Sequence, residues 1–385
     1  MDSRTGLPVV GMVGAGQLAR MTHQAAIALG QSLRILAADP EDSAALVAPD
    51  VHLGSPDDLE ALRRFAKGCD VVTFDHEHVP EGHVRELAAA GVVVRPGADA
   101  LRHAQDKRAM RERLTALGVP VPRWRQVTSP DQVAEFGDEV GWPLVGKAVR
   151  GGYDGRGMWT LSAPADAAEL LARGPLLVQE RAAGRRELAV QLARSPFGQV
   201  AVYPVVETVR RDGICREVLA PAPGLAADLA ADIHALAIRI ATDLDVVGLL
   251  AVELFETEAG VLVNELVMRP HHTGHWTLDG ARTSQFEQHL RAVLDYPLGE
   301  VTPLAPVVVM VNVLGAADPA QSLDERLHHA LAAEPGVKVH LYGRKERPGR
   351  TVGHVTALGD DLAEVRRRAR HAARVLEEGT RDRHR

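Results

Sequence analysis

Four glycines and a lysine near the middle of the chain form the pattern most typical of phosphate binding. The segment from Lys147 to Gly157 reads KAVRGGYDGRG. Glycine tolerates positive φ and has no side chain, so such a loop can turn its backbone N–H groups toward phosphate oxygens. Lys147 would add a positive charge on the same ligand. The segment lacks the Gly-Lys-Ser/Thr of a Walker A loop. A flexible surface loop would explain the glycines but not the Tyr, Asp and Arg among them, so we predict phosphate binding.

Two carboxylates further along, Glu253 and Glu265, are spaced as a metal site would require. They lie in two apolar runs, 249–255 and 261–266, that flank the turn sequence 257–260. If the hairpin is centred near Ala259, the two residues face each other, with Cβ atoms about 4.5–5.5 Å apart. Opposed carboxylates repel, and a divalent cation with oxygen ligands, such as Mg²⁺ bridging to ATP phosphates, would compensate. A protonated carboxyl, or a twist that separates the pair, is the alternative.

Two more segments combine cations with imidazoles or turn residues. Residues 268–276 read MRPHHTGHW. His271 and His275 could bind zinc from one helix, but the proline and glycine between them favour a loop, which suits a small anion better. Residues 342–350 read YGRKERPGR. This basic stretch fits either a phosphate-ester pocket or a solvated surface loop.

A first glycine-containing turn stands near the start of the chain. Residues 14–19 read GAGQLA, between an apolar run and a helical pattern, and Asp39 ends the next apolar run. This arrangement fits a dinucleotide fingerprint with an acid for a ribose hydroxyl. It equally fits a tight strand-to-helix turn, or a loop that holds another small anion at a helix N-terminus.

The elements that must position these residues begin with alternating strands and helices. Strands are predicted at 9–13, 33–38, 71–74 and 92–94, and helices at 17–29, 57–67 and 81–90. Such repetition predicts a parallel sheet with right-handed crossovers. A helical segment over 98–117 follows and ends at glycine and prolines. Beyond it we predict strands at 143–149, 158–161, 176–180, 187–193 and 307–313, the hairpin at 249–266, and helices at 226–244 and 323–333.

Length and composition bound the class of protein. The chain has 385 residues, which suggests two or three domains, and 46% hydrophobic against 25% charged residues is ordinary for a soluble globular protein. The 51 acidic and 44 basic residues give a net charge of -7, which argues against a non-specific nucleic-acid binder. Two cysteines are too few for a disulfide framework, and no apolar stretch is long enough to cross a membrane. We therefore expect a cytoplasmic protein without nucleic-acid or membrane partners.

Taken together, these segments resemble the ATP-grasp superfamily and, within it, the 5-(carboxyamino)imidazole ribonucleotide synthase family, the ATPase subunit of phosphoribosylaminoimidazole carboxylase. The similarity runs nearly end to end. The segments that carry it, in the order of the family, are GAGQLARM, TFDHEHVP, GGYDGRG, YPVVETVRRDGI, NELVMRPHHTGHWT, TSQFEQHLRAV and RPGRTVGH.

The resemblance implies a mixed α/β and α+β fold in three domains. These are an N-terminal Rossmann-like pre-ATP-grasp domain with a parallel sheet (1–106), an ATP-grasp domain (107–298), and a small C-terminal domain with the basic substrate loop (299–385). It also implies a homodimer. The implied reaction is an ATP- and bicarbonate-dependent carboxylation of 5-aminoimidazole ribonucleotide in purine biosynthesis, with ATP and Mg²⁺ as cofactors.

Residue by residue, the resemblance implies four sets of site residues. The ATP set is Lys107, Lys147, Gly152, Tyr153, Asp154, Gly155, Arg156, Gly157, Met158, Gln179, Glu180, Arg181, Ala182, Glu187, Arg210, Asn264 and Glu265. The metal ligands are Glu253 and Glu265. The residues of the chemical step are Arg269, His271 and Asp154. The ribonucleotide and bicarbonate set is Gln17, Leu18, Glu77, Tyr153, Arg156, Arg269, His271, Lys345 and Arg350.

The chain departs from the family pattern at several of these positions. Met158 stands where glutamine is usual, His272-Thr273 where Asn-Ser is usual, and Asp75 where glutamate is usual. Arg210 stands where histidine is common. In the basic loop, Arg344 rather than Lys345 is the alternative match.

Three other functions remain open from the sequence. Another ATP-grasp carboxylase or ligase, acting on a different ribonucleotide, would share the glycine loop and the carboxylates. An NAD-dependent oxidoreductase would use Gly14, Gly16 and Asp39 but leaves the second glycine loop unexplained. A non-catalytic nucleotide-binding module would have no need of Lys147 and both carboxylates.

Overall fold

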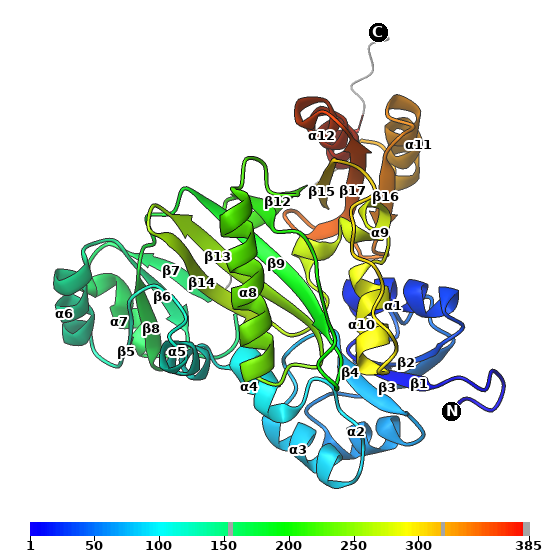
Figure 1. The fold of residues 1–385 in the computed structure, drawn as a ribbon, viewed down its shortest axis with the longest axis horizontal. Coiled ribbons are helices and arrows are strands. Elements are labelled where there is room, and N and C mark those ends of the chain that lie inside the picture. Colours follow the sequence, from blue (N-terminus) through cyan, green and yellow to red (C-terminus); the bar gives the residue numbers. More distant parts are fainter. Residues whose placement is uncertain (153–156, 317–319, 380–385) are drawn as a thin grey trace.

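The computed structural model describes residues 1–152, 157–316 and 320–379. The chain forms three sheets, arranged as a parallel domain, a small lobe and a long antiparallel sheet that continues into the C-terminal region (Figure 1). No helix in these ranges is long and apolar enough to cross a membrane.

The N-terminal domain is a four-stranded parallel sheet in the order β3-β2-β1-β4. Strands β1 and β4 are buried because helices and neighbouring segments cover both faces, whereas the edge strand β3 is only partly buried. Its elements are β1 (Val9–Val13), α1 (Gln17–Ala28), β2 (Ser32–Ala37), β3 (Asp50–Leu53), α2 (Leu59–Ala66), β4 (Val71–Phe74) and α3 (Glu81–Ala89).

Two sequence-based expectations fail in and after this domain. The predicted strand at 92–94 is wrong, because Val94 makes only an isolated bridge to Val72. The predicted helix over 98–117 is two helices, α4 (Ala98–Gln105) and α5 (Lys107–Ala116). Asp106 separates them with extended backbone (φ −124°, ψ 106°), and its side chain accepts from the Ala109 N–H to cap α5. The break matters because it places Lys107 at the start of a helix.

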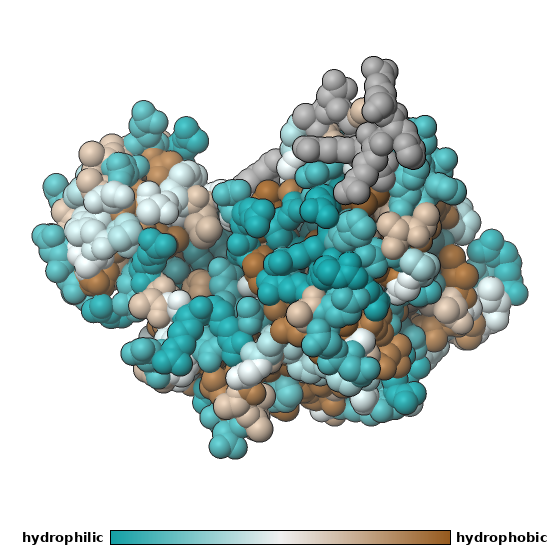
Figure 2. Space-filling model, turned by 90° about the horizontal axis from the view of Figure 1, so that it is seen from above, coloured by the Kyte–Doolittle hydropathy of each residue, from teal (hydrophilic) through white to brown (hydrophobic). Residues whose placement is uncertain are grey.

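The small lobe is a four-stranded antiparallel sheet, β5-β8-β6-β7. Its core gathers apolar residues from that sheet and from α6. Figure 2 shows this lobe at the left, separated from the rest of the molecule by a hollow. Its elements are β5 (Trp124–Val127), α6 (Pro130–Val140), β6 (Leu144–Ala148), β7 (Met158–Leu161), η1 (Pro164–Ala167), α7 (Ala168–Leu171) and β8 (Leu176–Glu180).

The third sheet runs β14-β13-β9-β11-β12-β15-β17-β16, with β10 paired to β9. The long helix α8 covers one face of it (Figure 1), where Ile233, Ala237 and Ile240 join the largest buried cluster. These elements are β9 (Arg186–Arg194), β10 (Val200–Val202), β11 (Val206–Arg211), β12 (Ile214–Ala220), α8 (Ala227–Asp243), β13 (Gly248–Thr257) and β14 (Gly260–Val267).

The C-terminal region adds strands to that same sheet and covers them with two helices. β15 pairs with β12, and apolar residues of α12 pack on β15 and β17. The remaining elements are η2 (His272–Gly274), α9 (Thr277–Gly280), α10 (Gln285–Val293), β15 (Val307–Leu314), α11 (Leu323–Ala333), β16 (Lys338–Leu341), β17 (Thr351–Gly359) and α12 (Leu362–Glu378).

Helix α10 joins the parallel domain to the long sheet. Leu290 and Val293 pack in one cluster with Val10 and Met12 of β1. On the same helix, His289 is fully buried between Thr73 of β4 and the backbone of Leu249 in β13. The parallel domain is therefore fixed against the long sheet by both apolar and polar contacts.

Candidate functional site

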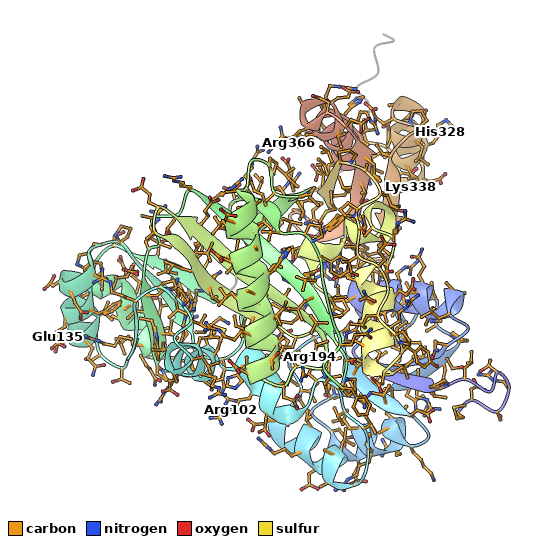
Figure 3. All side chains as sticks on the ribbon, viewed as in Figure 1. Arg102, Glu135, Arg194, His328, Lys338 and Arg366 are labelled. Carbon is orange, nitrogen blue, oxygen red and sulfur yellow. The ribbon has the colours of Figure 1, made fainter. Side chains whose placement is uncertain are left out.

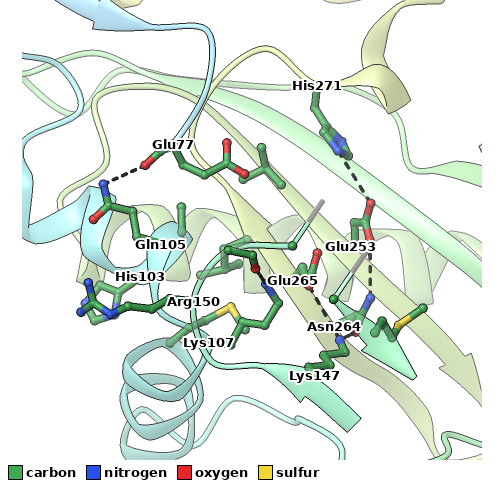
Figure 4. A pocket seen from close by; sticks show the side chains of 18 of the residues that line it. Glu77, His103, Gln105, Lys107, Lys147, Arg150, Glu253, Asn264, Glu265 and His271 are labelled. Carbon is green, nitrogen blue, oxygen red and sulfur yellow. Dashed lines mark hydrogen bonds and ion pairs between the residues drawn. The ribbon is translucent and has the colours of Figure 1, made fainter. Parts of the chain in front are cut away.

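A cavity of about 750 Å³ lies where the small lobe, the long sheet and the parallel domain meet (Figure 4). Its lining includes Lys147 from the small lobe and Glu253 and Glu265 from the long sheet. Glu77 enters from the loop after β4. Residues far apart in sequence thus share one concave surface of the size that small-molecule ligands occupy.

A β-bulge in the hairpin β13–β14 aims two consecutive side chains into this cavity. Glu253 pairs with Glu265, whereas the next residue, Leu254, pairs with Val263, so Asn264 is the extra residue. In a regular strand, Asn264 and Glu265 would point to opposite faces. The bulge lets both line the cavity. The predicted opposition of Glu253 and Glu265 is confirmed as a strand register.

The asparagine of the bulge links a cation and a carboxylate. Lys147 Nζ donates to Asn264 Oδ1 at 2.8 Å, and Asn264 Nδ2 donates to Glu253 Oε2 at 3.5 Å. Lys147 also lies 3.8 Å from Glu265 Oε1, and Lys107 lies 3.7 Å from the same oxygen. Five side chains from four elements are therefore connected by hydrogen bonds and ion pairs.

The electrostatics of this group follow from burial and from these pairs. Burial lowers the pKa of Lys147 to about 8, although Glu265 opposes the shift. Burial also acts to raise the pKa of Glu265, but the charges of Lys147 and Lys107 outweigh it and the net direction is down. Burial raises the pKa of Glu253, against the effect of Arg210. The site therefore keeps cationic and anionic groups close together in a weakly solvated space.

Arg210 is the strongest partner of Glu253. Its Nη2 donates to both carboxylate oxygens, at 3.0 and 3.1 Å, and its Nε donates to Glu187 at 2.5 Å. The neighbouring Glu253 raises the pKa of the Arg210 guanidinium, so it stays charged. Arg210 thus holds two predicted site residues in place.

Arg111 is a buried residue beside the cavity that the sequence analysis missed. It is almost fully buried, and it donates to the carbonyls of Val263 at 2.6 Å and Asn264 at 2.9 Å. It also donates to Gln179 Oε1 at 2.9 Å. Arg111 fixes the bulge backbone and connects it to β8. An arginine on the same side of α5 as the buried Met110 and Leu114 was the available signal.

A second buried ion pair connects the parallel domain to the loop after β14. Arg269 donates from Nε to Glu77 at 2.6 Å, and its charge holds the pKa of Glu77 at about 2 against the effect of burial. The loop itself is held by Gln285, which accepts from the His271 N–H and donates to the His271 carbonyl, both at 2.8 Å. Burial lowers the pKa of His271 well below its usual value, so the ring is neutral.

The glycine loop approaches this group from the small lobe. Gly151, Gly152 and Gly157 have φ of +72°, +79° and +72°, a conformation that glycine adopts without strain. Lys107 Nζ donates to the Gly151 carbonyl at 3.3 Å. Four predicted residues of the loop, Tyr153, Asp154, Gly155 and Arg156, lie outside the described residues.

Most of the other predicted ATP residues line the cavity, and one does not. Those that do are Met158, Gln179, Arg181, Ala182 and Glu187. Glu180 is absent from the lining, and its carboxylate accepts from Arg123 instead, at 2.7 Å.

The predicted ribonucleotide residues divide into two groups. Glu77, Arg269 and His271 line the cavity. Gln17, Leu18, Lys345 and Arg350 are not in its lining. Leu18 packs against Phe286 and Tyr342, while Lys345 and Arg350 are exposed.

In the basic loop, the structure brings Arg344 rather than Lys345 to the first glycine turn. A Cβ placed on Gly16 would lie 3.8 Å from Arg344 Nη2. The Gly16 N–H donates to Asp75 at 2.6 Å, and burial raises the pKa of Asp75 while the charge of Arg344 opposes that shift. Asp39 accepts from the Glu41 N–H within its own turn.

The donor set of the hairpin fits a magnesium ion. Glu253, Glu265 and Asn264 offer only oxygen ligands from side chains that share one wall of the cavity. The ring nitrogens of His271 and His272 lie near Glu253 but belong to a different class of ligand.

Comparisons with known proteins agree with this geometry along the whole chain. Three family models match: a ribonucleotide synthetase preATP-grasp domain at 7–105, an ATP-grasp domain at 112–286, and a phosphoribosylaminoimidazole carboxylase C-terminal domain at 308–368. The N5-carboxyaminoimidazole ribonucleotide synthase of Mycobacterium tuberculosis is 59% identical over 379 residues, which cover 97% of this chain and 88% of that protein.

The chain belongs to the N5-carboxyaminoimidazole ribonucleotide synthase family.

Other members of the synthase family are also similar to this chain over nearly its full length. The synthase of Corynebacterium ammoniagenes is 47% identical, covering 96% of this chain and 92% of the relative. The crystal structure of the Thermus thermophilus synthetase has a TM-score of 0.86 at 36% identity and covers 96% of this chain and 99% of that one. The Aspergillus clavatus synthase in complex with ADP and 5-aminoimidazole ribonucleotide has a TM-score of 0.87 at 30% identity, covering 96% and 98%.

The predictions of an ATP-grasp fold with a pre-ATP-grasp domain, and of an ATP-dependent ligase, are confirmed. Membership of the synthase family also disfavours the oxidoreductase interpretation of the first glycine turn. That turn instead lies beside Asp75 and Arg344.

Proposed function

We propose that this chain carboxylates the exocyclic amine of 5-aminoimidazole ribonucleotide with ATP and bicarbonate. The products are N5-carboxyaminoimidazole ribonucleotide, ADP and phosphate, a step of purine biosynthesis. The observation that carries the proposal is the single cavity in which Lys147, Glu253 and Glu265 face the Glu77–Arg269 pair. The wall with Lys147, Glu253 and Glu265 has the charged groups to bind a nucleoside triphosphate with its metal ion. The wall with the Glu77–Arg269 pair has an arginine that could bind a small anion beside a second substrate.

ATP would lie between the small lobe and the long sheet. Lys107 and Lys147 would contact its phosphates, and the glycine loop from Gly152 to Met158 would cover them. The segment from Gln179 to Ala182 would hold the adenine through its backbone, since the side chain of Glu180 is paired with Arg123. Glu187 would bind the ribose, and Arg210 would flank the nucleotide.

Mg²⁺ would be held by Glu253 and Glu265, with Asn264 beside them. When bound, the ion would neutralise charge on the phosphoryl group that is transferred. The lysines next to Glu265 already place positive charge in the same part of the cavity, so the protein itself contributes to this stabilisation.

Bicarbonate would bind near Arg269 and His271, with Asp154 of the loop completing the set for the chemical step. A bicarbonate oxygen attacks the γ-phosphorus, the bond to the β-phosphate oxygen breaks, and ADP leaves. The carboxyphosphate carbon, or CO₂ released from it, is then attacked by the amine. Phosphate leaves and the amine gives up one proton. Carboxyphosphate hydrolyses readily, so closure of the glycine loop would protect it from water.

The ribonucleotide would span from this point to the first glycine turn. Glu77, Tyr153 and Arg156 would contact its base and ribose, with Gln17 and Leu18 nearby. Lys345 and Arg350 are the cations implied for its phosphate. The structure favours Arg344 over Lys345, because Arg344 is the residue next to Gly16.

The proposal extends to the setting of the enzyme. We expect it to act in the cytoplasm as a homodimer, with Mg²⁺ as the metal and domain boundaries at 106/107 and 298/299. The product is a carbamate that decomposes in water, so an enzyme that rearranges or consumes it must act next.

ADP formation tests the proposal. With ATP, Mg²⁺ and bicarbonate present, ADP release should rise strongly on addition of 5-aminoimidazole ribonucleotide, and glycinamide ribonucleotide or biotin should have no such effect. Stimulation by either of those two instead would assign the chain to another ATP-grasp activity.

A further inference from the structure

A second group of metal-ligating side chains meets on the cavity wall beside the carboxylate pair. Glu253 of β13 and His271 and His272 of the loop after β14 each place a ligand atom within 4.8 Å of the other two. His271 Nε2 lies 3.8 Å from Glu253 Oε1, and the two imidazole centroids are 4.0 Å apart. Among the described residues, no other three His, Cys, Asp or Glu side chains bring their ligand atoms this close together.

His271 is oriented as a ligating histidine would be. Its Nδ1 lies 2.9 Å from Thr273 Oγ1, and its backbone is held on both sides by Gln285. When Nδ1 donates to the Thr273 hydroxyl, the other ring nitrogen is unprotonated and free to bind a metal. Here the nitrogen that remains, Nε2, is the one that faces Glu253.

His272 adds a buried ring nitrogen to the group. Its Nε2 has no hydrogen-bond partner among the described residues. Buried polar atoms are nearly always paired, so an unpaired nitrogen on a residue of this group points to something that binds there. The neighbouring Glu253 carboxylate would attract a cation to this position.

We propose that Glu253, His271 and His272 bind a divalent transition metal of the zinc class. Two imidazoles and a carboxylate suit Zn²⁺, with the remaining positions open to water, whereas Mg²⁺ prefers oxygen ligands alone. This site adjoins the one proposed for Mg²⁺, shares Glu253 with it, and includes His271, beside which bicarbonate is proposed to bind. Zinc should therefore compete with magnesium and inhibit carboxylation, and this consequence alone rests on the proposed function.

Arg210 limits how tightly the metal can be held. Its guanidinium contacts both oxygens of Glu253, at 3.0 and 3.1 Å, so the metal must share that carboxylate with a cation. Repulsion between Arg210 and the metal makes this site weaker than a closed structural zinc site. Exchangeable binding is the expected behaviour.

Direct metal binding to the full-length chain without nucleotide tests the proposal. Zn²⁺ is titrated by calorimetry, and Co²⁺ is titrated while its visible absorption is recorded. His272→Asn should weaken Zn²⁺ binding by at least roughly tenfold, because loss of a ligand should cost no less than loss of a residue that only orients one. The Co²⁺ spectrum should change as well. His328→Asn, at an exposed histidine on α11 (Figure 3), is the control and should leave both unchanged.

A pair of carboxamide variants locates the ion. Glu253→Gln should weaken Zn²⁺ binding and Glu265→Gln should not. Equal Zn²⁺ affinity in the His272→Asn and wild-type proteins would overturn the proposal, as would a loss in Glu265→Gln equal to that in Glu253→Gln. These measurements contain no ribonucleotide or ATP, so failure of the proposed carboxylation would leave their outcome unaffected.

Discussion

Charged side chains in the cavity occur as matched partners, and this matching explains how so many ionised groups can be buried together. The pairs are Arg210 with Glu253, Lys107 and Lys147 with Glu265, and Arg269 with Glu77. Removing one partner of a buried pair costs more than the pair contributes, because the other charge is left uncompensated. A single substitution in one of these pairs should therefore change both ligand affinity and the stability of the fold, and the two effects must be measured separately.

Glu265→Gln should reduce ATP turnover by at least roughly a hundredfold, the order expected when a group that stabilises the transferred charge is lost. The change keeps the volume but leaves Lys107 and Lys147 without their carboxylate partner, so the melting temperature should fall while the fold is retained. Glu258→Gln, in the exposed turn of the same hairpin, is the matched control. Turnover by Glu265→Gln close to wild type at limiting Mg²⁺ would show that Glu265 does not hold the metal.

Arg344→Ala should raise the KM for the ribonucleotide by about ten- to a hundredfold and leave the KM for ATP unchanged. The reason is that a hydrogen bond to a charged phosphate contributes about 1.5–3 kcal/mol. Lys345→Ala, one residue along, should have a smaller effect because its side chain is exposed. The dephosphorylated riboside is the control substrate, since it should bind wild type and Arg344→Ala equally poorly. A larger loss in Lys345→Ala would assign the contact to that lysine.

Single elements, rather than single residues, create the geometry of the site. The bulge between Glu253 and Leu254 turns Asn264 and Glu265 toward one cavity, and the break at Asp106 sets Lys107 at the start of α5. Helix α5 then supports the bulge through the three hydrogen bonds of Arg111. The proposed metal ligands are therefore supported by a helix that contributes no ligand of its own.

Arg111→Lys should weaken ATP binding by roughly five- to a hundredfold, because an ammonium cannot reach all three acceptors and each buried acceptor left unpaired costs about 1–3 kcal/mol. Arg113→Lys, on the exposed side of α5, should have no effect on ATP binding. Calorimetry with ADP gives the affinity, and a thermal melt gives the stability. A lower melting temperature with unchanged ADP affinity would make Arg111 a purely structural residue.

The elements also show which features could be predicted from the sequence. The hairpin and the opposition of Glu253 and Glu265 followed from two apolar runs around a turn, because strand pairing is local there. The bulge leaves no mark in that pattern, so the role of the extra residue Asn264 came from the resemblance alone. Arg111 was missed because its acceptors are backbone carbonyls about 150 residues away in sequence. The false strand at 92–94 is an apolar run too short to form a ladder.

At the scale of the whole molecule, three regions must keep their relative positions for the cavity to exist. His289 is one of the contacts that fixes them. Its Nδ1 accepts from the Leu249 N–H at 3.2 Å, so the proton of the neutral ring is on Nε2, which lies 2.8 Å from Thr73 Oγ1. Burial lowers the pKa of His289 to about 3. A second proton would have to be placed on a nitrogen that already faces a donor.

This contact predicts part of the acid sensitivity of the fold. Between about pH 6.5 and pH 3, the unfolded chain binds a proton at His289 that the folded chain does not, so stability is full above this window and falls as the pH drops through it. His289→Gln should reduce the change of the unfolding free energy with pH by about 1.4 kcal/mol per pH unit. Urea unfolding at pH 7, 6 and 5 measures the slope, and His328→Gln is the exposed control. An unchanged slope in His289→Gln would show that this histidine does not contribute.

Transfer of ¹³C from labelled bicarbonate to the ribonucleotide tests the proposed carboxylation. The chain is incubated with ATP, Mg²⁺ and 5-aminoimidazole ribonucleotide, and the product is followed by ¹³C NMR while ADP is measured in the same sample. We expect a carbamate carbon bonded to the exocyclic nitrogen, formed in a one-to-one ratio with ADP and absent without ATP. Label on a ring carbon, or ADP formed without any labelled ribonucleotide, would contradict this expectation.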